Sequence, residues 1–424
     1  MMPRILDAPA RGDTAHSPAR ASPAEPDPPT RPIRVLIVDT AIAFGGTLAV
    51  ARNLLKHLDP GRVDASLVSA CSDGFVSSGF AGKAQVRLLA PRVDYVTLQN
   101  WKLAIRRRFR SAALCRGLEL TAMATEFLAN LPYLLRLTHL YRKMRVDVVH
   151  ANNYTMEPLW AARLLGIPIV YHLHGLVPSA MDGSGRRNFR HVKAFVSISR
   201  AVTESALRAG IERTRIHDIP NFVERIPEGS PPPLPTEPAI GIFGRVTQWK
   251  GQKEFLQAAL RLLQRFPRLK VYVVGDASDG DPKYFDECRQ IAQSSPFAHR
   301  IDFTGRVTEV GAYYRKCTVV VHASTSPEPF GMVLIEAMAE ARPVVASTLG
   351  ATTEIIADGV DGYLVNPKDP EAMAARIATL LENPPLAAAM GLKGREKVLV
   401  CYDPLVASRR FERLYKEVAH NRDR

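Results

Sequence analysis

A proline-rich stretch divides this chain into two halves, each of which alternates strand-like and helical segments. Residues 228–238 read EGSPPPLPTEP, with five prolines in eleven residues. Proline cannot continue a helix or a central strand, so this segment predicts a stiff, extended linker. We therefore expect two domains of similar size, over residues 33–227 and 239–400.

Both halves begin with a short apolar run that predicts a buried strand, followed by a segment with helical spacing. In the first half these are IRVLIVD (33–39) and LAVARNLLKHL (48–58); in the second they are 239–244 and 251–266. Helical segments separate several of the later strand-like runs, which are 64–70, 146–150, 168–175, 194–199, 269–276, 300–305, 317–324 and 342–347.

Strands that alternate with helices predict an α/β protein with two doubly wound parallel sheets. Ligands of such sheets bind outside the carboxyl ends of the strands. Two sheets that face each other would place these ends at one inter-domain cleft, where we expect the functional site.

The chain ends are expected to lie outside the two sheets. Residues 1–32 contain eight prolines and no apolar segment, which predicts a disordered tail without a secretory signal. Residues 401–424 predict a helix that packs back on the N-terminal domain. No run of eighteen apolar residues predicts a membrane span. The five cysteines are widely spaced, which indicates reduced thiols and a cytoplasmic protein.

More than half of the formal net charge of +14 is concentrated in residues 102–145. This segment has ten Lys or Arg and two Glu, a net charge of +8, with apolar residues interleaved at helical intervals. Basic amphipathic helices bind anionic membrane surfaces. The alternative is a pair of packed helices with a solvated basic face. No motif for nucleic-acid binding is found.

The stretch SPEPFGMVLIEAMAE (326–340) places two carboxylates around the start of a predicted helix. Glu328 is held between two prolines, and Glu336 lies about one and a half turns inside the helix that Gly331 opens. A helix start offers unpaired N–H groups to an anion. The carboxylates would then accept hydrogen bonds from hydroxyl groups on either side of it, as in a nucleoside diphosphate sugar. The alternative is an acidic surface loop.

Two further segments could bind a diphosphate. FGRVTQWKGQ (243–252) places Arg245 and Lys250 at the carboxyl end of a strand, where cations would stabilise a leaving diphosphate. FGG (44–46) ends the first strand, and its glycines allow a backbone to approach a ligand closely. Solvated loop cations and a common turn are the alternatives.

Metal binding has less support in the sequence. His172 and His174 point to one face of a strand, and His150 could be a third ligand, but no carboxylate or cysteine cluster accompanies them. DGD (279–281) precedes a proline, which favours a turn. We expect neither a metal nor a cofactor.

Taken together, these motifs resemble the retaining glycosyltransferases of the GT-B fold, specifically family four. PEPFGMVLIE matches the E-x7-E pattern of that family, and GRVTQWKG matches its G-R-x-x-x-x-K-G. The resemblance continues through FTGRV (303–307) and 350–374, and it is thinner in the first domain. It implies two Rossmann-like domains that face a cleft.

The resemblance also implies roles for individual residues. Glu336 would bind the ribose, and Glu328 and His174 the transferred sugar. Arg245 and Lys250 would bind the diphosphate together with the backbone N–H of Gly46. The backbone of FTGRV would hold the base. The expected catalytic residues are Glu328, His174, Arg245 and Lys250, and the expected donor-binding residues are Glu336, Gly46, Gly244, Gly305, Val307, Phe330, Gly331, Met332 and Val333.

The resemblance implies a metal-independent hexosyltransferase that uses a nucleoside diphosphate sugar and a glycan or lipid-linked acceptor. We expect it on the cytoplasmic membrane face, docked through 102–145, and we expect no nucleic-acid partner. Where the family more often has a second glycine this chain has Ala351, to which no role is assigned. Two alternatives stay open: a non-catalytic binder of anionic surfaces on a glycosyltransferase scaffold, and a nucleotide-sugar epimerase.

Overall fold

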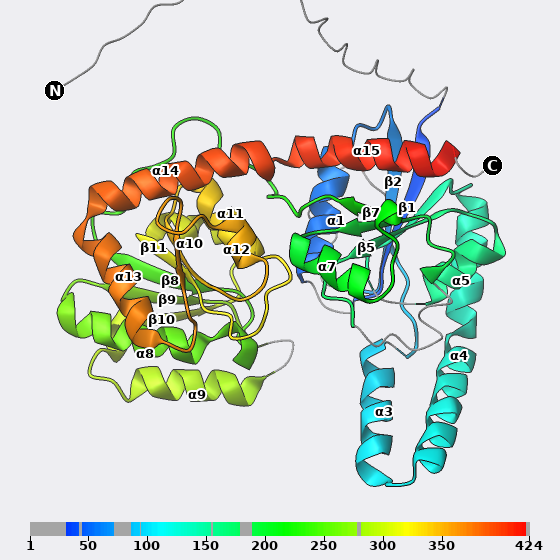
Figure 1. Cartoon of the computed structure of the whole chain (residues 1–424), viewed down its shortest axis with the longest axis horizontal. Coiled ribbons are helices and arrows are strands. Elements are labelled where there is room, and N and C mark those ends of the chain that lie inside the picture. The colour runs from blue at the N-terminus through cyan, green and yellow to red at the C-terminus, as the bar shows by residue number, and fades with distance from the viewer. Residues whose placement is uncertain are drawn as a thin grey trace, which may run out of the picture.

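The computed structural model contains two parallel β-sheets with helices on both faces, which confirms the predicted α/β fold (Figure 1). It describes residues 31–41, 45–71, 86–93, 95–153, 156–178, 189–277 and 281–420. The predicted tail therefore lies almost wholly outside the described residues, as do Phe44 of FGG and two residues of DGD. Arg31, at the end of that tail, pairs with Asp147 at 2.6 Å.

The first sheet has the strand order β3-β2-β1-β4-β5-β6-β7, and all its paired strands are parallel. Its strands are β1 (Ile33–Asp39), β2 (Val63–Ser69), β3 (Val86–Leu88), β4 (Val148–Ala151), β5 (Ile169–Leu173), β6 (Ala194–Ser197) and β7 (Ile216–Asp218). The helices of this half are α1 (Gly46–His57), α3 (Tyr95–Arg108), α4 (Ala112–Lys143), α5 (Glu157–Leu164) and α7 (Arg200–Arg208).

The second sheet has the order β10-β9-β8-β11-β12-β13 and is also parallel throughout. Its strands are β8 (Ala239–Phe243), β9 (Lys270–Val274), β10 (Ile301–Gly305), β11 (Val319–His322), β12 (Val344–Ser347) and β13 (Tyr363–Val365). Its helices are α8 (Gln252–Arg265), α9 (Pro282–Gln293), α10 (Val310–Lys316), α11 (Met332–Ala339), α12 (Thr352–Ile355), α13 (Pro370–Glu382) and α14 (Pro384–Cys401), followed by α15 (Pro404–His420). Short 3-10 turns occupy Arg213–Arg215, Gln248–Lys250 and Ala298–Arg300.

The predicted strands are present to within two residues at most ends, because most of them are apolar runs buried on both faces of the sheet. The exception is β10, an edge strand that is only half-buried. Alternate residues of β1 face different helices. Val35 and Ile37 pack with α1 and α15, and Leu36 and Val38 pack with α4, α5 and α7. The strands β3, β7 and β13 were not predicted. Each has only three residues and lies on or near a sheet edge, where little apolar sequence is needed.

The last two helices connect the two halves. Helix α14 packs on α11 of the second half, and α15 runs across to pack on α1 and on β1 of the first half (Figure 1). Phe411 and Tyr415 of α15 are fully buried in the core of the first sheet. The chain therefore crosses between the halves twice, through the linker and through α14–α15.

Two buried arginines hold the proline linker against the second half. Arg342 donates to the carbonyl oxygens of Pro232 and Pro233, and Arg395 donates to that of Gly229 at 3.2 Å. Arginine carries several donors in a rigid plane, so it can satisfy carbonyl groups that face no backbone N–H. The linker thus has a defined path on the protein.

The basic segment forms a helical hairpin, α3–α4, that projects from the first half (Figure 1). Its basic side chains are interleaved with apolar ones along both helices, as the sequence indicates. Many large apolar side chains are solvent-exposed along the hairpin: Trp101, Leu103, Phe109, Leu114, Leu120, Phe127, Leu128, Leu131 and Leu135. Across the described ranges, no helix is both long enough and apolar enough to cross a bilayer.

Candidate active site

A pocket of about 820 Å³ lies between the two halves and is lined by residues of both. The second half contributes the carboxyl ends of β8, β9 and β10 and one side of α10 and α11. The first half contributes α1 and the segment after β7. The pocket therefore lies where the sequence places the ligand site, at the carboxyl ends of parallel strands. Its lining side chains include Ala49, Arg52, Val223, Glu224, Arg225, Phe243, Arg245, Val274, Asp276, Arg306, Val307, Thr308, Glu309, Tyr314, Val333, Glu336 and Glu340.

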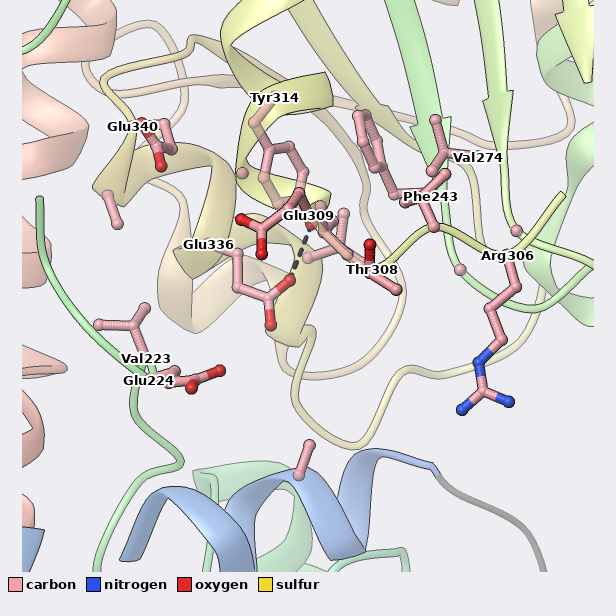
Figure 2. A pocket seen from close by; sticks show the side chains of 18 of the residues that line it. Val223, Glu224, Phe243, Val274, Arg306, Thr308, Glu309, Tyr314, Glu336 and Glu340 are labelled. Atoms are coloured by element: carbon pink, nitrogen blue, oxygen red, sulfur yellow. Dashed lines mark hydrogen bonds between the residues drawn. The ribbon is translucent and has the colours of Figure 1, made fainter. Parts of the chain in front are cut away.

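Glu336 is a carboxylate of this pocket that a tyrosine hydroxyl holds in place. Its Oε2 accepts a 2.8 Å hydrogen bond from the Tyr314 hydroxyl, and Glu224 faces it from the first half (Figure 2). Burial, reinforced by the charge of Glu224, raises the pKa of Glu336 to about 7. Glu224 itself is held by Arg52 at 2.6 Å and by Lys56. Glu336 thus changes its charge near neutral pH.

This pKa predicts how donor binding depends on pH. A ribose hydroxyl donates to a carboxylate, so binding should favour ionised Glu336. Because its pKa is about 7, the affinity for a sugar nucleotide should rise roughly tenfold between pH 6 and 8. Titration calorimetry across this range measures the effect. In Glu336→Gln the affinity should be lower and flat with pH, and an unchanged pH dependence in that variant would contradict the assignment.

Glu328 is ionised and anchored by three donors that converge on one oxygen. Its Oε2 accepts from Lys250 Nζ at 2.8 Å, from Ser324 Oγ at 2.9 Å and from His322 Nε2 at 3.0 Å. Burial alone would favour the neutral acid, but the His322 hydrogen bond and the Lys250 charge hold the pKa of Glu328 well below its usual range. No described residue donates to Oε1, so this oxygen can accept a hydrogen bond from a ligand.

The backbone of Glu328 is held as firmly as its side chain. Its N–H donates to Leu349 O at 3.2 Å, and its carbonyl accepts from Ala351 N at 2.9 Å. A Cβ on Gly350 would lie 2.3 Å from the Glu328 carbonyl oxygen, so the close approach requires glycine there. Ala351 has φ −71° and ψ −7°, a right-handed conformation that any residue adopts. This explains why the second glycine can be replaced.

The two predicted cations lie close together. Arg245 lines the pocket, and it is near enough to Lys250 for its charge to act on the pKa of that lysine. Burial, and to a smaller degree the charge of Arg245, lowers the pKa of Lys250 despite its ion pair with Glu328. The Lys250 ammonium also lies 4.0 Å from the centroid of the Trp249 ring. The cluster therefore concentrates positive charge beside an ionised carboxylate.

Two helix starts offer unpaired N–H groups near these charges. Helix α1 begins at Gly46 without a side-chain cap, and Ala49 and Arg52 of the same helix line the pocket. Helix α11 begins at Met332, one residue later than predicted, after Gly331 at φ 112°. A glycine is favoured at that φ because other residues are strained there. Both ends are suited to anions.

The predicted residues fall into two groups. Among them, Gly244, Arg245, Val307, Val333 and Glu336 line the pocket. Those that do not line it are Glu328, Lys250, His174, Gly46, Gly305, Phe330, Gly331 and Met332. Three of the second group are linked to pocket residues. The charge of Arg245 reaches Lys250, Lys250 pairs with Glu328, and Gly46 begins the helix that carries Arg52.

The three histidines contact one another in a row, through one pair of ring nitrogens and one ring stacking. His150 Nδ1 lies 2.6 Å from the Tyr415 hydroxyl, and its Nε2 lies 3.2 Å from His172 Nδ1. His174 stacks on His172 with ring centroids 3.9 Å apart, and its Nε2 lies 3.0 Å from Asn152 Oδ1. Among the residues that the structure describes, no group of three His, Cys, Asp or Glu side chains is arranged to hold a metal. Asp281 of DGD accepts from Tyr284 N and caps α9.

Sequence reasoning missed several polar partners. His322 and Ser324 hold Glu328, Tyr314 holds Glu336, and Asn152 holds His174. One signal was available for His322 and Asn152. Each lies at the carboxyl end of a strand in a parallel sheet, the edge where ligand-binding side chains gather.

Comparison with known proteins places this architecture in a class. The protein HepE of Anabaena, solved in complex with UDP and glucose, superposes with a TM-score of 0.72 at 21% identity, over 91% of this chain and 99% of that one. Sucrose-phosphate synthase of Thermosynechococcus elongatus superposes with a TM-score of 0.69 at 20% identity, over 92% of this chain and 100% of that one. The fold is therefore that of the GT-B class.

Sequence relatives define the family. Residues 44–225 match the family "Glycosyltransferase Family 4", and residues 229–397 match "Glycosyl transferases group 1". A stretch of 287 residues is 31% identical to phosphatidyl-myo-inositol mannosyltransferase of Mycobacterium leprae, over 64% of this chain and 74% of that protein. A stretch of 158 residues is 34% identical to the lipopolysaccharide core biosynthesis mannosyltransferase LpcC of Rhizobium leguminosarum, over 37% of this chain and 45% of that protein. The chain thus spans less than half the length of LpcC. This chain belongs to the GT-B glycosyltransferases of family four.

Proposed function

We propose that the protein is a retaining glycosyltransferase that moves a hexose from a nucleoside diphosphate sugar to a glycan or lipid-linked acceptor without a metal ion. One observation carries this proposal. Arg245 and Glu336 line the inter-domain pocket, and Lys250, which the charge of Arg245 reaches, pairs with an ionised, buried Glu328 that has one oxygen uncommitted to any described residue. The names of both mannosyltransferase relatives support a hexose and a lipid-containing acceptor.

The donor would occupy the pocket with its ribose against Glu336. The backbone of Gly305 and Val307 would hold the base. The diphosphate would face Arg245, Lys250 and the unpaired N–H groups at the start of α1. The sugar would then reach the Oε1 atom of Glu328, which accepts a hydrogen bond from one of the sugar hydroxyl groups. This order of contacts follows the order of chemical groups in a sugar nucleotide.

In the proposed reaction, the bond between the anomeric carbon and the diphosphate breaks, and the electron pair stays on the phosphate oxygen. Arg245 and Lys250 stabilise the charge that develops there. The acceptor oxygen bonds to the anomeric carbon on the same face, and its proton passes to the leaving phosphate. This step needs no protein base, and Glu328 orients the sugar.

A donor screen tests the function. Release of nucleoside diphosphate should be measured with sugar nucleotides that combine guanosine or uridine with mannose, glucose or galactose, with and without EDTA. One donor should be turned over, with activity unchanged by EDTA. Binding without turnover of any donor would instead support a non-catalytic binder. Loss of activity with EDTA, reversed by a divalent ion, would contradict metal independence.

The α3–α4 hairpin supports a lipid-linked acceptor. Its tip, residues 107–111, joins the end of α3 to α4 and carries Arg107, Arg108 and Arg110 with exposed Phe109. Cations near an anionic bilayer contribute on the order of 1 kcal/mol each, and exposed apolar side chains add interfacial burial. We propose that the hairpin docks the enzyme on the cytoplasmic face of the membrane.

Vesicle binding tests this docking. Replacing Arg107, Arg108 and Arg110 with Gln should release the protein from anionic vesicles in a co-sedimentation assay. Arg106 is kept because it pairs with Glu119 at 2.6 Å and joins the two helices. Binding of the wild type should weaken with salt, since the Debye length falls from ~10 Å at 0.1 M to ~3 Å at 1 M.

A matched variant controls for total charge. Arg409, Arg410 and Arg413 are exposed on α15, away from the hairpin, and replacing these three with Gln removes the same charge. This variant should sediment with vesicles like the wild type. Equal loss in both variants would indicate a net-charge effect, and no binding by the wild type would leave only a solvated basic hairpin.

A further inference from the structure

Asp39 is a buried carboxylate at the carboxyl end of β1 with contacts to two parts of the site. Its Oδ1 accepts from Ala41 N at 2.8 Å and from Asn153 Nδ2 at 2.8 Å. Its Oδ2 accepts from Asn152 Nδ2 at 2.6 Å. Asp39 therefore contacts both the β1–α1 connection and the end of β4.

The amide of Asn152 can take only one orientation. Its Nδ2 faces Asp39 Oδ2 and also the backbone carbonyl of Thr47, at 3.0 Å. A carbonyl oxygen can only accept a hydrogen bond, so the NH2 group must point to this side. The Oδ1 atom of Asn152 is consequently directed at His174 Nε2, 3.0 Å away.

This orientation determines which nitrogen of His174 carries the proton. Burial lowers the pKa of His174 to about 3, so the ring is neutral and has one N–H. Because Asn152 Oδ1 accepts, Nε2 must be the donor. The Nδ1 atom then keeps its lone pair and is an acceptor.

We propose that Asp39 and Asn152 are positioning residues that fix His174 as the Nε2–H tautomer and thereby present Nδ1 as a hydrogen-bond acceptor to a hydroxyl group of the donor sugar. The inference rests on the proposed function for the identity of the ligand. It requires that a substrate hydroxyl donates to His174, and it excludes a role for His174 as a hydrogen-bond donor to the sugar.

The same carboxylate also ties His174 to the start of α1. Asp39 accepts the N–H of Ala41, and the amide of Asn152 is held in its one orientation partly by Thr47 O, which lies in the first turn of α1. A donor that binds at the α1 start therefore meets a His174 ring whose tautomer is already set. Such preorganisation avoids rearrangement during the reaction.

Nuclear magnetic resonance of the full chain labelled with 15N-histidine reads the tautomer directly. The His174 signals are assigned from their absence in His174→Gln. In the wild type, Nε2 should carry the proton. In Asp39→Asn, the new NH2 group opposes the NH2 group of Asn152, which only Thr47 O then holds in place. The Asn152 amide should therefore reverse in part of the population, and a second set of signals should show the His174 proton on Nδ1. The substituted side chain would keep an oxygen for Ala41 N, so the α1 start should be retained.

Asn153→Ala is the matched control. It removes a hydrogen bond to Asp39 but leaves the contact between Asp39 and Asn152, so the histidine spectrum should match the wild type. A proton on Nδ1 of wild-type His174 would overturn the inference, whatever the activity of the enzyme.

Kinetic measurements test whether the His174 tautomer matters for the contact with the sugar. Asp39→Asn should lower kcat/KM for the donor found in the screen by roughly tenfold, since one buried hydrogen bond is lost. The dissociation constant of the nucleoside diphosphate, which lacks the sugar, should be unchanged. His174→Asn can place an oxygen near the Nδ1 position and should retain more activity than His174→Gln, which reaches only the Nε2 position.

The outcomes are distinguishable. A reversed tautomer in Asp39→Asn with unchanged kcat/KM would overturn the positioning role. If Asp39→Asn does not fold, the wild-type spectrum still tests the tautomer and the two His174 variants test the acceptor role. Greater activity in His174→Gln than in His174→Asn would contradict that role. If no sugar nucleotide is turned over, the proposed function fails and with it the sugar contact, while the spectrum still decides the tautomer.

Discussion

Replacing Glu328 with glutamine is expected to lower kcat by about 10²–10³-fold while changing the donor KM much less. Glutamine keeps the size of the side chain but removes the charge that Lys250 and His322 hold in place. In the proposed site, Glu328 orients the reacting sugar, so its loss is felt mainly in the transition state. Steady-state measurement of nucleoside diphosphate release gives both constants.

Glu336 is expected to affect donor binding, whereas Glu328 affects turnover. Its ribose contact is made equally in the ground and transition states, so Glu336→Ala should mainly weaken donor binding. Glu371, exposed on α13, is a control carboxylate whose change to Gln should leave both constants unchanged. The assignment fails if Glu328→Gln retains near-wild-type turnover. Removing one partner of a buried ion pair also destabilises a fold, so thermal unfolding should be measured alongside.

Removing either cation of the pair Arg245 and Lys250 is expected to reduce turnover by roughly 10- to 100-fold, as loss of a charge-assisted hydrogen bond of ~1.5–3 kcal/mol implies. These groups meet charge that grows as the glycosyl bond breaks, so kcat should fall with limited loss of fold. Lys250→Arg should rescue only in part, because a larger, planar guanidinium does not reproduce the point contact that the Lys250 ammonium makes with Glu328 Oε2.

Lys250→Met should also introduce an acidic limb in the pH profile of kcat. In the wild type the pKa of Glu328 is held well below its usual range, so Glu328 stays ionised throughout the working pH. Without Lys250 that pKa rises, and activity should be lost as the pH falls through the raised value. Lys253→Ala is the control, since this half-buried lysine pairs with Glu287 and does not line the pocket. A pH profile identical to the wild type would show that Lys250 does not act through Glu328.

The two parallel sheets could be predicted from the sequence because their signal is local. A strand buried on both faces is a short apolar run, and β8 shows this over its whole length and β1 over Val35 to Val38. The segments PEPFG and GRVTQWKG likewise carry turn and helix-start residues whose effect depends on near neighbours. Glu328, Glu336, Arg245 and Lys250 could therefore be singled out as candidates.

The partners of these residues depend on contacts between distant segments. Lys250 meets Glu328 across 78 positions, and Asn152 meets Asp39 across 113. These pairs form because β8 lies next to β11, and β1 next to β4, in the sheets. Strand order is set by how helices pack over the sheets, which apolar periodicity does not encode.

In the α3–α4 hairpin and in α15, too, one feature is local to the sequence and another depends on the tertiary structure. Their helical character follows from residue spacing along the chain. Only the tertiary structure decided that the hairpin projects with its apolar side chains exposed, and that α15 crosses to the first sheet and buries Phe411 and Tyr415. The physical reason is that burial depends on which surface is available to cover a helix, and that surface is created by parts of the chain far away in sequence.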